Sequence, residues 1–179
     1  NIRGWLTSIN DPTDLSGDLF GMDLCYNDTT RVGGLTTLAQ YNGNISGIRW
    51  KSEGDRYIKG YGYSYDGLNR LTSSDYGEGS SFSNNQDRYR ESIGSYDLMG
   101  NIISLTRYDS IMIDSLLYNY TGNQLNKIED RADTTKGFID STNDADYQYD
   151  LNGNLTKDLN KGISIIEYNY LNLPSKVKK

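Results

Sequence analysis

The sequence predicts an all-β fold made of repeated antiparallel β-hairpins. The chain of 179 residues contains 16 tyrosines and 19 glycines but only 2 prolines, and tyrosine favours strands whereas proline interrupts them. Aromatic residues alternate with small ones over short stretches, as from Tyr61 to Tyr65. In a β-strand this alternation places the aromatic side chains on one face and the small ones on the other. Clusters of Asp, Asn and Gly, which favour tight turns, separate these stretches.

The first 38 residues are expected to form a lead-in to the hairpins. We interpret Arg3–Ile9 as the outgoing strand of an earlier, partial repeat. Residues 11–30 are interpreted as a loop that is followed by a strand, because an apolar stretch begins at Leu19.

Residues 39–179 contain about six copies of one pattern, and we expect them to form one continuous architecture. Each copy has a tyrosine, a polar turn and an aliphatic residue that opens the next strand. The residues that anchor the pattern are Tyr41, Tyr65, Asp66, Tyr96, Asp97, Gly100, Asn101, Tyr118, Gly122, Asn123, Tyr149, Asp150, Gly153, Asn154 and Tyr168. The spacing of the copies is irregular, so we expect the insertions to lie in loops at one rim of a stack.

Each copy has the order strand, turn, strand, which is a β-hairpin. The expected turns are Asp66-Gly67, Gly100-Asn101, Gly122-Asn123 and Asn152-Gly153, and we expect a positive φ at Gly100 or Gly153. The expected second strands include residues 102–107 and 125–128. The polar segment from Glu78 to Glu91 is expected to be a long loop, with room for a short helical turn around residues 86–91.

The copies resemble the YD repeats of the RHS family. The best matches are Tyr65-Asp66-Gly67-Leu68-Asn69-Arg70-Leu71 and Tyr149-Asp150-Leu151-Asn152-Gly153-Asn154-Leu155, and the resemblance extends from about Ala39 to Lys179. The segment that begins at Tyr168 is similar to RHS proteins of Bacteroidetes-type bacteria.

The resemblance implies that the hairpins form part of a spiralling β-sheet shell around a cavity. In relatives such a shell encloses a toxic C-terminal domain, and in teneurin-like relatives it serves as an extracellular adhesion platform. The sequence departs from the RHS pattern because its only Asp-Pro pair, Asp11-Pro12, lies near the beginning and lacks the following glycine of the RHS core. We therefore do not assign the plug protease or the toxin domain to this chain, and we expect it to be a fragment of a shell.

Composition excludes several classes of chemistry. The chain has no histidine, which excludes Ser-His-Asp and Cys-His catalysis and histidine-ligated zinc within it. Its net charge of -6 argues against non-specific binding of nucleic acid, and no apolar run is long enough to predict insertion into a membrane. The single Cys25 is expected to fill space in the core.

Two motifs have a functional and a structural interpretation. The acidic run from Asp140 to Asp146 could ligate calcium, but it lacks the glycine and the terminal glutamate of an EF-hand, which favours a solvated turn. Gly60-Tyr61-Gly62 and Gly77-Glu78-Gly79 faintly resemble phosphate loops but lack a third glycine and a following helix. No cofactor or metal is therefore expected.

The aromatic residues support two interpretations of function. Trp5, Trp50 and the tyrosines could stack on sugars, although the packing of repeats explains the same residues without a ligand. We therefore expect a non-catalytic shell segment of a secreted or cell-surface bacterial protein that encapsulates or scaffolds an effector. The alternative is a cell-surface segment for adhesion or glycan binding. The expected partners are the rest of its own shell, an effector domain or another protein chain, because a cut shell exposes unpaired strand edges near residues 3–9 and 168–177.

Overall fold

The computed structural model describes residues 2–86, 88–132, 135–141 and 144–179. Strands make up 45% of the chain and helix 2%, which confirms the predicted all-β class. The elements of the described part are β1 (Ser8–Ile9), β2 (Phe20–Cys25), η1 (Thr30–Val32), β3 (Gly47–Ser52), β4 (Lys59–Tyr65), β5 (Leu71–Glu78), β6 (Glu91–Tyr96), β7 (Ile102–Tyr108), β8 (Met112–Thr121), β9 (Gln124–Asp130), β10 (Tyr147–Tyr149), β11 (Leu155–Asp158), β12 (Ile165–Tyr168) and β13 (Pro174–Lys178).

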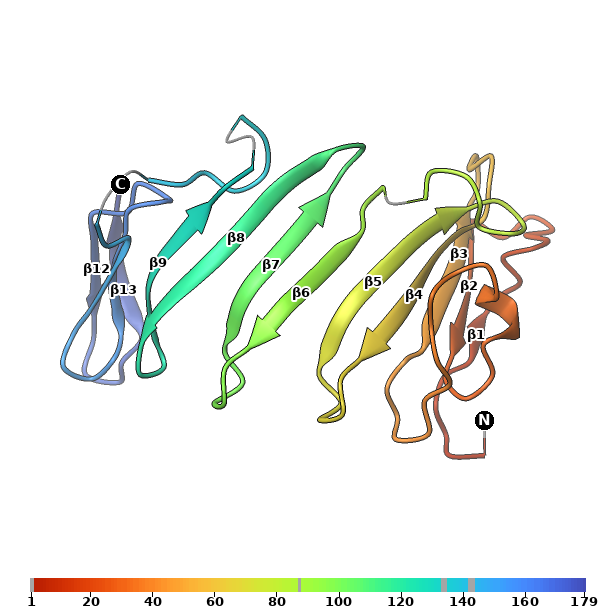
Figure 1. Cartoon of the computed structure of the whole chain (residues 1–179), viewed down its shortest axis with the longest axis horizontal. Helices are drawn as coiled ribbons and strands as arrows, with labels where there is room; N and C mark the ends of the chain where they lie inside the picture. Colours follow the sequence, from red (N-terminus) through yellow and green to blue (C-terminus); the bar gives the residue numbers. More distant parts are fainter. Residues whose placement is uncertain (1, 87, 133–134, 142–143) are drawn as a thin grey trace. The chain divides into compact units, whose positions relative to one another are not determined.

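Figure 1 labels the strands, and within each sheet neighbouring strands are also neighbours in the sequence. Strands β1 to β9 form one sheet in that order, and β10–β11 and β12–β13 form separate two-stranded sheets. The hairpin pairs are antiparallel. Such a meander needs only short connections, which is why the sequence repeats strand and turn along its length.

The chain divides into two compact units, which we describe separately. The first unit contains the residues up to 92 together with residues 107–111. One face of its sheet is covered by two connections: Val32 of η1 comes from the connection between β2 and β3, and Phe82 from the connection between β5 and β6. Both side chains are buried.

Glycines on strands β3, β4 and β5 make this covering possible. A Cβ atom on Gly60 would lie 2.5 Å from Cε1 of the Phe82 ring, and one on Gly47 would lie 2.7 Å from Cγ2 of Val32. A Cβ atom on Gly77 would meet the backbone carbonyl of Phe82. The two glycine motifs that faintly resembled phosphate loops are therefore places where a loop packs directly on a strand.

The opposite face of these strands carries aromatic rings. Tyr61 and Tyr76 lie directly opposite each other on β4 and β5, with their ring centroids 5.1 Å apart. Trp50 stacks on Tyr61 at 5.8 Å, and Tyr63 stacks on the other side of Tyr61 at 6.0 Å. The two pairs that join neighbouring strands, Tyr61–Tyr76 and Trp50–Tyr61, stabilise the sheet by roughly 0.2–1 kcal/mol each, whereas Tyr61 and Tyr63 lie on the same strand.

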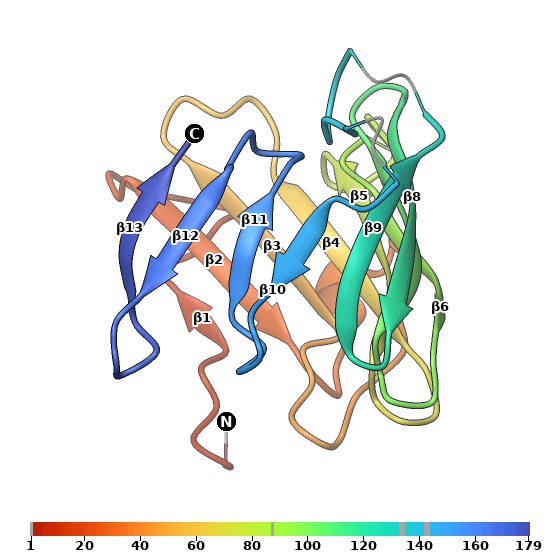
Figure 2. The ribbon, with the colours of Figure 1, turned by 90° about the vertical axis from the view of Figure 1, so that its left-hand side faces the viewer.

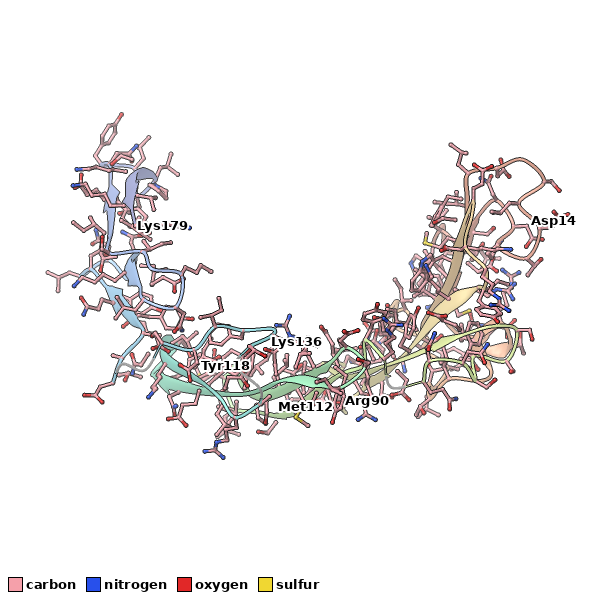
Figure 3. The ribbon with its side chains drawn as sticks, turned by 90° about the horizontal axis from the view of Figure 1, so that it is seen from above. Asp14, Arg90, Met112, Tyr118, Lys136 and Lys179 are labelled. Atoms are coloured by element: carbon pink, nitrogen blue, oxygen red, sulfur yellow. The ribbon has the colours of Figure 1, made fainter. Side chains whose placement is uncertain are left out.

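The second unit contains residues 93–106 and 112–179. Leu116 on β8 and Ile128 on β9 are its buried apolar side chains in the described part. Figure 2 shows the hairpins β10–β11 and β12–β13 side by side in this unit. Seen from above, side chains stand on both sides of the strands (Figure 3). The residues of the last strand, β13, are exposed.

Most expected elements are confirmed, including strands at residues 61–65, 102–107 and 125–128 and a loop before the strand at residue 20. The loop from residue 78 to residue 91 differs from expectation. Its described residues contain no helical turn around residues 86–91, and Asp87 lies outside the described part. Instead Asn84 pairs with Glu78 in an isolated bridge, which extends β5 and carries Phe82 onto the glycines.

Candidate functional site

The most regular feature of the chain is the turn of its hairpins. In four of the turns the first residue uses its side chain as a cap. Asp97 Oδ1, for example, accepts hydrogen bonds from the backbone N–H groups of Met99 and Asn101, both at 2.8 Å. Its Oδ2 accepts a third bond from the side-chain amide of Asn101, at 2.8 Å. The same oxygen positions are used at the other caps, Asp66, Asp150 and Asn169, although Asn169 makes only the two bonds to backbone N–H groups.

These hydrogen bonds favour the charged form of the aspartates. They hold the pKa of Asp66, Asp97 and Asp150 below the ordinary value for aspartate. For Asp97 and Asp150 the largest cause is the side-chain amide of the asparagine four residues further on, and for Asp66 it is the backbone N–H of Arg70. The aspartate of the Tyr-Asp pattern is therefore a turn cap and stays ionised.

The fourth residue of each turn has a positive φ, and its N–H bonds back to the carbonyl of the cap. These residues are Asn69 (φ 64), Gly100 (φ 90), Gly153 (φ 83) and Asn172 (φ 56). The expected positive φ is thus confirmed at both Gly100 and Gly153. The expected turn at Asp66-Gly67 is confirmed, and in it Asn69, not Gly67, takes the left-handed conformation.

The hairpin β8–β9 has a shorter turn. Thr121 pairs with Gln124, so only Gly122 and Asn123 lie between the strands, and Gly122 has a φ of 58. A positive φ at the first of two turn residues is typical of hairpin turns that contain glycine. The expected Gly122-Asn123 turn is confirmed.

Tyrosine hydroxyls join several hairpins of the described part to the hairpin before them. The tyrosine that precedes a turn donates a hydrogen bond to the backbone carbonyl that opens the outgoing strand of the preceding copy. We call these bonds the tyrosine ladder; the described pairs are Tyr26 to Leu6 (3.0 Å), Tyr65 to Ile45 (2.7 Å), Tyr120 to Ile102 (3.0 Å), Tyr149 to Leu125 (2.9 Å) and Tyr168 to Leu155 (2.8 Å). Burial raises the pKa of Tyr65, Tyr120 and Tyr149, so these hydroxyls keep the proton that they donate.

A β-bulge lies opposite each of four ladder tyrosines, with the extra residue in the outgoing strand of the same hairpin. The strand register shifts at Tyr65, Tyr120, Tyr149 and Tyr168. An extra residue in one strand turns the neighbouring side chain to a new direction. The bulge also shows that Tyr120, and not the anchor residue Tyr118, occupies the ladder position in β8.

Asparagine side chains join neighbouring turns along the same rim. Asn42 donates to Oδ1 of Asn69 at 2.6 Å, and Asn101 donates to Oδ1 of Asn123 at 3.1 Å. Asn154 donates to Oδ1 of Asn172 at 3.0 Å. Sequence analysis identified Asn101, Asn123 and Asn154 as anchors, but it missed the partners at positions 42, 69 and 172.

The remaining anchor tyrosines have other positions. Tyr41 precedes the short Asn42-Gly43-Asn44 turn, and its side chain is 67% exposed. Tyr96 ends β6 directly before the cap Asp97. Tyr118 lies within β8, where its Cα pairs with that of Ile128.

Buried aspartates hold the connections between hairpins. Asp146 is fully buried; its Oδ2 accepts the N–H of Ile128 at 2.8 Å, and its Oδ1 accepts the hydroxyl of Ser141 at 2.8 Å. Within the described residues, no three acidic or thiol side chains gather closely enough to hold a metal ion. The acidic run from residue 140 was expected to be a solvated turn, but its last residue, Asp146, is buried because its carboxylate accepts these two hydrogen bonds. Residues 142 and 143 of the run lie outside the described part.

Cys25 has the expected core position. It is 3% exposed, and burial raises the pKa of its thiol, so the reactive thiolate is disfavoured. In the part of the chain that the structure describes, no helix is long and apolar enough to cross a bilayer.

One cavity contains an aromatic ring that sequence analysis singled out. It has a volume of about 340 Å³ and is lined by Trp5, Tyr41, Asn27 and Gln40 together with Ile2 and Arg3. The guanidinium group of Arg3 lies 5.0 Å from the Trp5 ring centroid. Trp50, by contrast, belongs to the aromatic stack on β3 and β4.

Comparisons of the chain with family models, with curated proteins and with solved structures find no match. The turns, the tyrosine ladder and the asparagine bonds are therefore the features on which a functional proposal rests.

Proposed function

We propose that this chain is a non-catalytic segment of the wall of an RHS-type shell, in a secreted bacterial protein that encapsulates or scaffolds an effector. The observation that carries the proposal is the tyrosine ladder. Four hairpins of the described part use the same hydroxyl-to-carbonyl bond to attach to the one before them, and the bond recurs between copies that differ in length and loops. Because each of these hairpins contacts its neighbour through the same bond, further hairpins can be added to the wall in the same way.

The distribution of polar groups supports a structural role. The ionised aspartates of the turns are saturated by N–H groups of their own turn, as for Asp150. Their ionised state contributes turn stability, and they lack the raised pKa that a general acid needs at neutral pH. The thiol of Cys25 is buried.

The proposal is tested on the natural polypeptide that contains residues 1–179. Electron cryomicroscopy should show a hollow particle with these hairpins in its wall, and a protease should cleave the enclosed effector only after the wall is denatured. Tyr149→Phe removes one ladder bond and should shorten the time of protection, whereas Tyr170→Phe, at a side chain that is 92% exposed, should not. An open ribbon without an enclosed space would refute the shell.

A second candidate function is saccharide binding at the cavity beside Trp5. An aromatic ring with two amide side chains, Asn27 and Gln40, offers a stacking surface and groups that can pair with hydroxyls. Titration of tryptophan fluorescence with a panel of oligosaccharides tests it. A response that Trp5→Phe abolishes and Trp50→Phe retains would support binding, and the absence of any response would exclude this function for the saccharides tried.

A further inference from the structure

The last hairpin, β12–β13, has a carbonyl at the position that accepts the tyrosine ladder. In the hairpin before it, Leu155 follows Asn154, whose carbonyl accepts the backbone N–H of the turn cap at 2.9 Å. In the last hairpin, Pro174 follows Leu173, whose carbonyl accepts the N–H of the cap Asn169 at 3.0 Å. Pro174 is therefore equivalent to Leu155, the acceptor of the Tyr168 hydroxyl.

Proline is compatible with this acceptor position. Hairpins β10–β11 and β12–β13 form separate two-stranded sheets. The Tyr168 hydroxyl joins them by donating to the carbonyl of Leu155, a bond that uses the carbonyl of residue 155 and not its N–H. Proline lacks the backbone N–H but keeps its carbonyl. Pro174 can therefore accept a tyrosine hydroxyl as Leu155 does.

Strand β13 is available to a neighbour. Its five residues are exposed, and within the described residues it pairs with β12 alone. Val177 is 56% exposed although it lies opposite Ile166 in the hairpin, so an added strand would cover apolar surface there. Figure 3 marks Lys179 at the end of this strand.

The direction of the strands decides which neighbour fits. In the three ladder bonds of the second unit, the strand that receives the bond runs away from its turn. The strand that donates runs toward the next turn and carries its tyrosine at its last residue, or at the last but one in β8. Strand β1 follows the positive φ of Gly4 and contains no tyrosine, and the carbonyl of Leu6 just before it accepts a ladder bond. It is therefore an outgoing strand like β13. With the turn rims aligned, a second copy would place β1 parallel to β13 and bring no hydroxyl.

We propose that the free edge of β13 binds the incoming strand of a further hairpin of the same kind, and that the tyrosine ending this strand donates its hydroxyl to the carbonyl of Pro174. This inference rests on the proposed function, because it uses the ladder as the rule of attachment. It names the partner: an antiparallel strand that ends in tyrosine before a turn with an Asp or Asn cap.

The test extends the chain by one hairpin: residues 159–178 are repeated directly after Val177, so that the repeat takes the place of Lys178 and Lys179. This junction keeps the separation of 13 residues between acceptor and tyrosine that Leu155 and Tyr168 have. Hydrogen exchange of the β13 amides is then measured with and without the added hairpin. We expect slower exchange with it, and about five-fold less protection when the added copy of Tyr168 is changed to Phe, which corresponds to one net hydrogen bond.

The added copy of Tyr170 supplies the matched control, since this side chain is solvent-exposed in its own hairpin. Changing it to Phe should leave the protection of β13 unchanged. Unchanged exchange on extension, or equal effects of the two changes, would overturn the proposal. Protection of β13 that rises with the concentration of the unextended chain would also overturn it, because the occupant would then be a second copy.

One further variant separates this inference from the proposed function. Tyr168→Phe in the unextended chain removes an existing ladder bond to Leu155. If this variant exchanges faster in β12–β13 while the extension has no effect, the tyrosine ladder still stabilises the hairpins and only the binding at β13 is refuted. If neither the variant nor the extension changes the exchange, both the ladder and the binding at β13 are refuted.

Discussion

Replacing Gly153 tests whether the turns have the backbone conformation described above. Gly153 has a φ of +83, and a Cβ atom on it would meet only Nε2 of Gln124, at 3.7 Å. A substitution would therefore cause no steric overlap, and any loss of stability must come from the left-handed backbone. That conformation costs an L-residue roughly 1–2 kcal/mol, but asparagine adopts it more readily than other residues.

The chain supplies its own reference residues for this comparison. Asn69 and Asn172 occupy the same position in their turns, with φ values of 64 and 56. Gly153→Ala should lower the free energy of unfolding by about 1–2 kcal/mol. Gly153→Asn should recover most of that loss, because its side chain is the one that the other turns use.

Gly67→Ala is the control for a glycine in a similar turn. Gly67 has no positive φ, and no atom lies within 4 Å of the place that a Cβ would occupy, so alanine should fit and raise stability by about 0.4–1 kcal/mol through the unfolded state. Urea denaturation followed by circular dichroism measures all three variants. Equal losses for Gly67→Ala and Gly153→Ala would refute the assignment of the left-handed residue.

Three further predictions concern packing, pH and the thiol. Gly60→Ala should destabilise the chain by about 1–3 kcal/mol, because its Cβ would overlap the Phe82 ring, and calorimetry should show a much smaller further loss when it is added to Phe82→Ala. The pKa values of Asp66, Asp97 and Asp150 are lower in the folded chain, so these carboxylates stabilise the fold above their unfolded pKa near 3.8 and lose this effect as the pH falls through the folded values. The urea concentration at the unfolding midpoint should therefore decline between about pH 5 and about pH 2. It should decline less when all three are changed to Asn, the residue that caps the turn at position 169. A thiol reagent should label Cys25 slowly in the native chain and rapidly in urea, and fast native labelling would contradict its burial.

The sequence alone was sufficient to predict the strands and the residues that shape the turns. Strand alternation has a period of two, and the Tyr61–Tyr65 stretch shows it without any tertiary information. Turn chemistry is equally local, because Asp97 bonds to groups two and four residues away. The positive φ of Gly100 and Gly153 follows from the same local chemistry.

Register and long-range contacts could not be obtained in this way. Tyr118 and Tyr120 lie on the same face of β8 and precede the same turn, so only the bulge and the shorter turn decide that Tyr120 reaches Ile102. In the longer turns the ladder tyrosine lies four residues before the residue with positive φ, as Tyr149 does before Gly153. Tyr118, and not Tyr120, has that spacing to Gly122, so the spacing of the other copies selects the wrong tyrosine in β8.

The glycines of β4 and β5 mark the boundary between what sequence and tertiary structure determine. Local pattern places Gly60 and Gly77 in strands, where glycine is unfavourable, but it cannot say what requires the missing side chain. The reason is Phe82, which comes from a polar loop and packs on both glycines from outside the sheet. Sequence determined the hairpins because their hydrogen bonds join near neighbours in the chain. Tertiary structure decided the cover of the sheet and the tyrosine ladder, because these contacts join residues whose separation no local pattern encodes.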